Sequence, residues 1–447
     1  MKLPSHVSYC IETLEGAGFA AYAVGGCVRD WTLGLPPHDF DLCTAALPED
    51  VQRLFAGYGL VTAGVKHGTV GVIFDRDVVE ITTFRKEGDY ADGRHPDWVA
   101  FVEDVEEDLA RRDFTVNAMA WSPTRGLADP FGGQADLQRK ILRTVRRPED
   151  RFREDPLRIL RGARFAAKYQ LTPEPETLDA MITLVPLMEG LARERVFSEL
   201  CKLLLHARWE DLLRYAPLIT QVIPELAAAV GFDQHSPYHQ FDLYTHIAHV
   251  TAAVPRELPV RWAALLHDVG KPATFTMDEA GRGHFYGHAQ EGSAMADAIL
   301  RRLKAPNQLR LQVTRLIELH MNRPEPHRKT VRRWISQMGR ETFLQLLALQ
   351  QADMGGKGTE PEAAPFDALR ELAEELSREE ACLSLRDLAI DGGDLLALGV
   401  PEGKGIGQCL RSLLEQVVEE QLPNDRDRLL EAAKKYFDTE YELKVHF

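Results

Sequence analysis

The sequence YAVGGCVRDWTLGLPPHDFDLCT, from Tyr22 to Thr44, decides the fold of the N-terminal part of this chain. Its first residues continue the apolar run FAAYAV, which predicts a short strand that ends at the glycine pair Gly25-Gly26. Its last residues, DFDLCT, predict a second strand that carries Asp39 and Asp41. Alternate residues of a strand project from the same face, so we expect these two carboxylates to point in the same direction.

The paired carboxylates predict a site for divalent cations. Two converging carboxylates repel each other unless a cation lies between them, and Mg²⁺ favours such oxygen ligands. A two-ion site usually needs a third carboxylate, for which Glu80 in the apolar run VVEITTF is the best candidate. Glycines that end a strand let backbone amides approach phosphate, and Arg29 adds a forked donor. The alternative is an acidic surface turn, but the glycine pair favours nucleotidyl transfer.

Composition and length set the general class of protein. The chain has 447 residues, which predicts roughly three domains, and 45% of them are hydrophobic and 27% charged, as in ordinary globular proteins. We expect no transmembrane helix and no signal peptide, and the six cysteines lack metal-site spacing, which favours reduced thiols in the cytoplasm. The net charge of −15 argues against a protein coated by nucleic acid.

The sequence predicts an α+β fold. The first 145 or so residues mix strand and helix patterns, including a hairpin over VGVIFDRDVVEITTF and further strands at LADPF and KILRTV. Beyond Glu149 the apolar residues recur at helical spacing. We therefore expect an α/β head with a small mixed sheet, followed by an all-helical neck, body and tail.

Six segments of the chain, in order, resemble the motifs of one enzyme family. GGCVRDWTLG…HDFDLCT resembles the signature of the class II tRNA nucleotidyltransferases, which share the polymerase β nucleotidyltransferase fold. The likeness continues through HGTVGVIFDRDVVEITTFR, EEDLARRDFTVNAMA, DPFGGQADL, REDPLRILRGARFAAKY and RERVFSELCKLLL. Together these segments cover roughly residues 20–205. The resemblance implies an enzyme that uses Mg²⁺, CTP and ATP to extend tRNA.

The resemblance also implies roles for individual residues. The residues implied for the triphosphate and the catalytic metals are Gly26, Arg29, Asp39, Asp41 and Glu80. Those implied for the sugar, the base and further phosphates are Arg112, Asp113, Asn117, Glu154, Asp155, Arg158, Arg161 and Arg164. The spacing of three between the last three arginines independently predicts one stripe on a helix. Asp155 and Arg158 are also three residues apart, so we expect one helix to place an acceptor at Asp155 beside a donor at Arg158. Such an edge suits cytosine or adenine; the alternative for these arginines is a surface ion-pair ladder.

Class II contains enzymes that add CCA, CC or A to tRNA, and poly(A) polymerases. CC-adding members lack a loop that is present here at residues 85–109, and the chain has AGVKHGTV where poly(A) polymerases carry a basic-aromatic signature. Complete CCA addition is therefore favoured over addition of CC alone and over poly(A) synthesis, and addition of A alone stays an alternative, because A-adding enzymes keep most of the same motifs. A non-catalytic RNA-binding protein is disfavoured, because two unneutralised acids would hinder RNA binding.

A second group of residues predicts a metal site in the helical body. His246, the pair His267-Asp268 and Asp353 follow the order found in HD metal-dependent phosphohydrolases, and His288 and His320 are further candidate ligands. Imidazoles with carboxylates suit Mn²⁺, Ni²⁺ or iron. A hydrolase of this class is the alternative function; a structural RNA-binding body, with histidines that are ordinary core residues, is the other possibility.

The predicted domains are a catalytic head at residues 1–145, a neck with base-selecting and RNA-binding helices at residues 146–230, an HD-type body at residues 231–355 and a tRNA-binding tail at residues 356–447. The expected partners are tRNA, CTP and ATP, with no membrane and no obligate protein partner. Basic clusters at residues 139–147 and 328–340 are candidates for contacts with the tRNA backbone, since phosphate contacts position RNA without reading its sequence.

Overall fold

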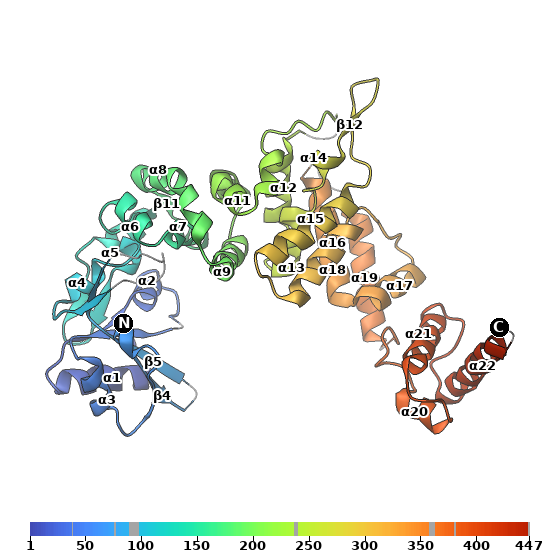
Figure 1. Ribbon diagram of the computed structural model, residues 1–447, viewed down its shortest axis with the longest axis horizontal. Helices are drawn as coiled ribbons and strands as arrows, with labels where there is room; N and C mark the ends of the chain where they lie inside the picture. Colours follow the sequence, from blue (N-terminus) through green and yellow to red (C-terminus); the bar gives the residue numbers. More distant parts are fainter. Residues whose placement is uncertain are drawn as a thin grey trace. The chain divides into compact units, whose positions relative to one another are not determined.

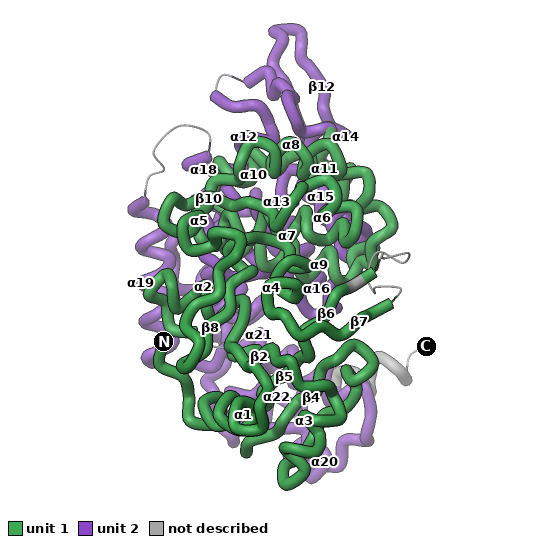
Figure 2. The backbone as a smooth tube through the Cα atoms, turned by 90° about the vertical axis from the view of Figure 1, so that its left-hand side faces the viewer, with its two compact units in different colours: residues 1–227, 302–304 green, residues 228–301, 305–447 purple. Residues whose placement is uncertain are grey.

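The computed structural model describes residues 1–37, 39–75, 77–88, 98–236, 240–356, 363–379 and 381–445. These residues form two compact units, which are drawn in different colours in Figure 2. Unit 1 contains residues 1–227 and 302–304, and unit 2 contains residues 228–301 and 305–447. The predicted division into four domains remains a prediction.

Unit 1 is built on a seven-stranded mixed sheet with the order β3-β4-β5-β2-β1-β8-β9. Its strands are β1 (Ala21–Val24), β2 (Asp41–Thr44), β3 (Gly59–Val61), β4 (Thr69–Phe74), β5 (Asp77–Thr83), β8 (Ala120–Ser122) and β9 (Gly126–Ala128). The β2–β5 pair is parallel, and the other pairs are antiparallel. A separate pair joins β6 (Arg85–Glu87) to β7 (Val99–Phe101). The predicted α+β class, with a mixed sheet in the head, is confirmed.

The strand predictions hold in part. The hairpin over residues 70–84 is confirmed, because β4 and β5 pair from Thr69 with Thr82 to Phe74 with Asp77. The predicted strand DFDLCT begins only at Asp41, so Asp39 lies in the connection before β2 rather than within the strand. LADPF supplies only the end of β9, and KILRTV supplies the two-residue β10 (Ile141–Leu142), which pairs with β11 (Thr172–Pro173).

The helices of unit 1 cover the sheet and continue beyond it (Figure 1). They are α1 (Ser5–Gly16), α2 (Gly26–Thr32), α3 (Pro48–Leu54), α4 (Val105–Leu109), α5 (Gly133–Arg139), α6 (Pro148–Glu154), α7 (Leu157–Tyr169), α8 (Pro175–Thr183), α9 (Arg193–Leu204), α10 (Trp209–Arg214) and α11 (Ala216–Val222). The amphipathic α7 buries Ile159, Leu160 and Ala163 and packs against α9. Its basic residues therefore remain on the opposite side, where they line a cavity.

The boundary between α6 and α7 corrects one expectation. Asp155 was expected to lie on the same helix as Arg158, but it has an extended backbone, with φ −138° and ψ 98°, and lies between the two helices. The following Pro156 explains the break, since a proline disfavours helical geometry in the residue before it. The Asp155 carboxylate instead accepts a hydrogen bond from the backbone N–H of Leu157, at the start of α7.

Unit 2 is helical apart from a short hairpin, β12 (Thr276–Met277) with β13 (Gly283–His284). Its helices are α12 (Leu243–Ala253), α13 (Leu258–Leu266), α14 (Lys271–Thr274), α15 (His288–Arg302), α16 (Asn307–Leu319), α17 (Arg328–Met338), α18 (Arg340–Gly355), α19 (Ala364–Arg378), α20 (Gly392–Ala397), α21 (Lys404–Val418) and α22 (Arg426–Val445). Helices α12, α13, α16 and α18 pack together around the fully buried Trp262. All six cysteines are buried and free, and no helix within the described ranges could cross a membrane.

Candidate active site

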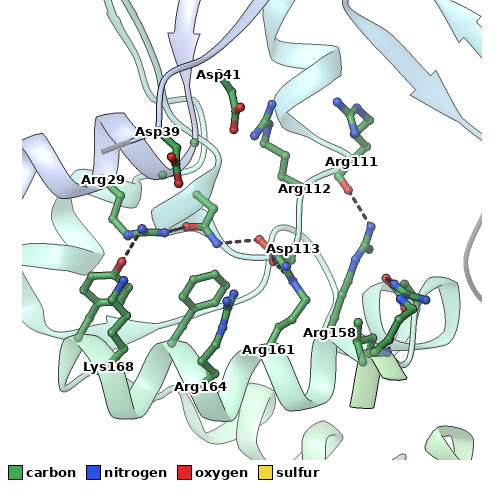
Figure 3. A pocket seen from close by; sticks show the side chains of 18 of the residues that line it. Arg29, Asp39, Asp41, Arg111, Arg112, Asp113, Arg158, Arg161, Arg164 and Lys168 are labelled. Carbon is green, nitrogen blue, oxygen red and sulfur yellow. Dashed lines mark hydrogen bonds and ion pairs between the residues drawn. The ribbon is translucent and has the colours of Figure 1, made fainter. Parts of the chain in front are cut away.

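A cavity of about 740 Å³ in unit 1 gathers most of the predicted head residues. Figure 3 shows Asp39 and Asp41 across this cavity from the basic side chains of α7. The predicted residues that line it are Gly26, Arg29, Asp39, Asp41, Arg112, Asp113, Asn117, Asp155, Arg158, Arg161 and Arg164. An adjacent cavity of about 680 Å³ shares Asp39 and Asp41 and adds Glu80. The carboxylates therefore lie where two cavities meet.

The turn between β1 and α2 requires glycine at its first position. Gly25 has φ +73° and ψ −120°, a conformation that glycine adopts far more readily than other residues. A Cβ atom at this position would lie 2.9 Å from Nη1 of Arg112. The absence of a side chain at Gly25 therefore lets Arg112 approach the backbone of the predicted phosphate turn.

The parallel pairing of β2 with β5 places two of the three carboxylates side by side. Leu42 pairs with Ile81, so the preceding residues, Asp41 and Glu80, are neighbours that project from the same face. Burial raises the pKa of Asp41, and the charge of Glu80 raises it further. Oxygen ligands that repel one another in this way fit a site for hard divalent cations.

A chain of hydrogen bonds connects the predicted sugar-binding residues to Arg29. The Asp113 carboxylate accepts from Nδ2 of Asn117 at 2.9 Å and from Nε and Nη2 of Arg161 at 2.9 and 2.6 Å. The amide oxygen of Asn117 accepts from Nη1 of Arg29 at 2.5 Å. Burial alone would raise the pKa of Asp113, but Arg161 and Asn117 outweigh it and hold this pKa well below its usual range. Asp113 is therefore a buried anion that holds α7 against the head.

Arg112 is anchored by a residue that the sequence analysis did not single out. Asp108 is fully buried and contacts Arg112 at 3.3 Å and Arg111 at 2.9 Å. Burial alone would raise the pKa of Asp108, but the two arginines lower it overall. Asp108 therefore anchors both arginines at the wall of the cavity.

The predicted base-selecting residues are held by further contacts. Nη1 of Arg158 donates to Glu154 at 2.8 Å, and Nη2 donates to the backbone carbonyl of Arg111 at 3.1 Å. Asp155 accepts from Nη2 of Arg195 at 3.3 Å. Arg195 also lines the cavity, although the sequence analysis quoted its motif without naming it. The sequence feature that could have pointed to Arg195 is its position as the second arginine of the motif RERVFSELCKLLL.

The structure also brings together all six candidate ligands of the helical body. His246, His267, Asp268 and Asp353 are buried and offer ligand atoms that lie within 4.8 Å of one another. Asp268 forms a second such group with His288 and His320. Within the described ranges, these are the two groups of at least three histidine, cysteine or acidic residues whose ligand atoms all lie within 4.8 Å of one another.

The four histidines among the candidate ligands of the body are oriented alike. In each ring Nδ1 lies next to a backbone carbonyl oxygen, namely that of Gly356, Ala264, Phe285 and Ile317, at 2.6–3.1 Å. The Nε2 atoms of His246 and His267 are 3.3 Å apart, as are those of His288 and His320. Donation from Nδ1 to a carbonyl leaves the Nε2 lone pair for a metal, the arrangement typical of histidine ligands.

Comparison with known proteins identifies the family. The model of the poly A polymerase head domain matches residues 21–143, a "Probable RNA and SrmB- binding site of polymerase A" matches residues 170–230, and tRNA nucleotidyltransferase domain 2 matches residues 285–433. The CCA-adding enzyme of Limosilactobacillus fermentum is 34% identical over 425 residues, which cover 95% of this chain and 94% of that protein. The chain belongs to the CCA-adding enzymes. The CCA-adding enzyme of Streptococcus gordonii is also 34% identical, over 94% of both chains.

Solved structures of CCA-adding enzymes have the same fold. The crystal structure of the Bacillus stearothermophilus CCA-adding enzyme in complex with CTP matches with a TM-score of 0.71 and 28% identity, over 99% of this chain and 100% of that one. The Thermotoga maritima CCA-adding enzyme complexed with tRNA matches with a TM-score of 0.54 and 20% identity, over 97% and 95%. The predictions of family, fold class and nucleotidyltransferase activity are therefore confirmed, and the role of each site residue remains a prediction.

Proposed function

We propose that this CCA-adding enzyme extends the 3′ end of tRNA with CCA from CTP and ATP, without a nucleic-acid template. The observation that carries the proposal is the single cavity in which Asp39 and Asp41 face the basic stripe of α7. The carboxylates suit phosphoryl-transfer metals, and Asp155 with Arg158 offers a mixed hydrogen-bonding edge to the base. The proposed location is the cytoplasm, with which six free cysteines are consistent.

The metal proposed for the head is Mg²⁺, held by Asp39, Asp41 and Glu80. When bound, such ions stabilise charge on the triphosphate and favour the deprotonated 3′ hydroxyl of the tRNA. Asp39 and Asp41 line both cavities. We infer that the nucleotide occupies the larger cavity and that the tRNA 3′ end enters through the one containing Glu80. The carboxylates would then hold the two reacting groups within reach of each other.

The remaining head residues would bind and orient the nucleotide. Arg112, Asp113 and Asn117 are proposed for the sugar, and Gly26 and Arg29 for the triphosphate. Glu154 fixes Arg158 through an ion pair, as a residue that steadies the base-selecting edge would. Arg161 and Arg164 supply positive charge on the same face of α7.

The test is extension of three tRNAs that end at the discriminator base, at C or at CC, with CTP and ATP given singly and together. Growth of all three to CCA, followed by a stop, is the expected result. Growth of the CC-ending tRNA alone, and only with ATP, would identify an A-adding enzyme. Continued addition of A would identify a poly(A) polymerase.

A second candidate function, hydrolysis of phosphomonoesters or 2′,3′-cyclic phosphates, is favoured by the buried ligand clusters of the body. We propose that His246, His267, Asp268 and Asp353 hold a transition metal such as Mn²⁺, Ni²⁺ or iron. Asp268 would bridge to a second ion held by His288 and His320, since it belongs to both groups. The test is the metal content of the purified protein, together with hydrolysis of both substrates. A His267→Ala variant should lose both metal and hydrolysis while CCA addition continues.

A further inference from the structure

Arg29 uses three of its five N–H groups to hold neighbouring side chains. It is 6% exposed, and each of its three nitrogens already has an acceptor. Nε donates to Asp30 at 2.9 Å, Nη1 to Asn117 at 2.5 Å and Nη2 to the hydroxyl of Tyr169 at 2.5 Å. Its guanidinium carbon also lies 4.3 Å from the centre of the Tyr169 ring. Arg29 therefore positions its neighbours and keeps part of its donor capacity for the triphosphate.

Lys168, in the last turn of α7, has the opposite properties. It is exposed and lines the cavity, and within the described residues it has no carboxylate partner. Its ammonium group lies 4.9 Å from the centre of the Tyr169 ring. By contrast, Arg161 and Arg164 on the same helix contact Asp113 and Glu199. Lys168 therefore offers the cavity a cation that no carboxylate of the described ranges pairs with.

Tyr169 presents a hydrogen-bond donor at the same place. Its hydroxyl oxygen accepts from Arg29, which leaves the hydroxyl hydrogen for another acceptor. The part of the chain that the structure describes supplies no acceptor for this hydrogen. The ring is fixed by Arg29 on its face and by Phe165, which stacks at a centroid distance of 6.2 Å. The hydroxyl is thus oriented by a cation that favours donation to an anion.

We propose that Lys168 and Tyr169 bind the β- and γ-phosphates of the incoming nucleotide directly, beside Arg29, which also orients Tyr169. Lys168 lies at the C-terminal end of α7 beside the cavity (Figure 3). Tyr169, the last residue of α7, lines the same cavity. The inference rests on the proposed function, since it assumes that a nucleoside triphosphate occupies this cavity.

The experiment compares the binding of CTP, ATP and CMP to the full chain by titration calorimetry, without tRNA. Lys168→Gln and Tyr169→Phe are the test variants. Arg53→Gln is the matched control, because it removes one exposed cation of the same unit outside the cavity. A charge-assisted hydrogen bond contributes about a tenfold or larger factor in affinity. We therefore expect Lys168→Gln to weaken CTP and ATP about tenfold and Tyr169→Phe about fivefold, with CMP changed less than about twofold.

The outcomes separate this inference from the proposed function. If both variants bound CTP as tightly as the wild type does, the assignment of Lys168 and Tyr169 would be wrong. Equal weakening of CTP binding and CMP binding would also overturn the assignment. The cause would then be a disturbed cavity and not the loss of a contact with the β- or γ-phosphate. If the wild-type protein bound neither triphosphate, the proposed function itself would fail. Melting temperatures within about 2 °C of the wild type would show that the variants are folded.

Discussion

Replacing Asp113 by asparagine would remove a charge from the centre of the hydrogen-bond chain in the head. Both oxygens of Asp113 accept: Oδ1 from Asn117 and the backbone N–H of Phe114, and Oδ2 from Arg161. An asparagine would turn an amide NH₂ toward one of these donors and leave Arg161 without its counter-ion. Breaking one partner of a buried ion pair costs about 3–5 kcal/mol. Because the Arg161 side chain is 34% exposed, water offsets part of this loss, and we expect about 2 kcal/mol.

The assay is thermal unfolding of the wild type, Asp113→Asn, Arg161→Met and the double variant. A loss of about 2 kcal/mol should lower the melting temperature of a unit of this size by about 4–8 °C. If the two side chains stabilise each other, the double variant should lose less unfolding free energy than the two single variants lose together, by about 1–2 kcal/mol. Additivity within about 0.5 kcal/mol would refute the reasoning, because it would mean that the pair contributes no coupling.

The pH dependence of the same comparison gives a second check. The folded-state pKa of Asp113 is lowered, so its contribution is fully present above the unfolded-state pKa of about 3.9 and is lost as pH falls toward the folded value. The stability difference between the wild type and Asp113→Asn should therefore be constant from about pH 5 to 8 and shrink below about pH 4. A difference that grows on acidification would contradict the ion pair.

Three further experiments test other parts of the protein. Asp41→Ala should abolish nucleotide addition in the extension assay while tRNA binding, measured by filter retention, remains; loss of binding would instead indicate a structural role. Gly25→Ala should cost about 1–3 kcal/mol in unfolding free energy and reduce addition, because its Cβ would lie 2.9 Å from Arg112. The matched Gly126→Ala, with φ +74° and open space around its Cβ, should leave addition unchanged, and equal losses of addition would point to strain alone. Removal of bound metal with a chelator should lower the melting temperature of the wild type and leave that of His267→Ala unchanged. Equal shifts of the two melting temperatures would argue against a metal in the body.

Local sequence patterns predicted the carboxylate hairpin well. The paired strands on either side of Asp75 lie close together in the chain, so alternation and turn residues determine their register. The parallel neighbour of Asp41 is different. Its pairing with the strand of Glu80 joins residues about forty positions apart. The single acid in the apolar run VVEITTF marked Glu80 as a candidate ligand, but no local pattern could show that the two strands are neighbours.

Contacts between distant segments were beyond sequence reasoning. Arg328 and Arg332 belong to a basic cluster proposed for the tRNA backbone, but they contact Glu379 and Glu420. Their partners lie 51 and 88 residues away, so the charge pattern of α17 alone could not reveal them. The break at Asp155 is another case. Its sequence signal, the following proline, was present but was outweighed by the helical spacing of the arginines.

The hydrogen-bond chain of the head begins and ends on the same helix. Arg161 contacts Asp113, and eight residues later Tyr169 accepts from Arg29, so α7 is tied to the head at two points that are about 12 Å apart along its axis. A rotation or a shift of the helix would have to break both attachments at once. If Asp155 and Arg158 select the base, as proposed, a change from CTP to ATP would have to be accommodated without a movement of α7. The helix itself would serve as a fixed frame of reference throughout the three additions.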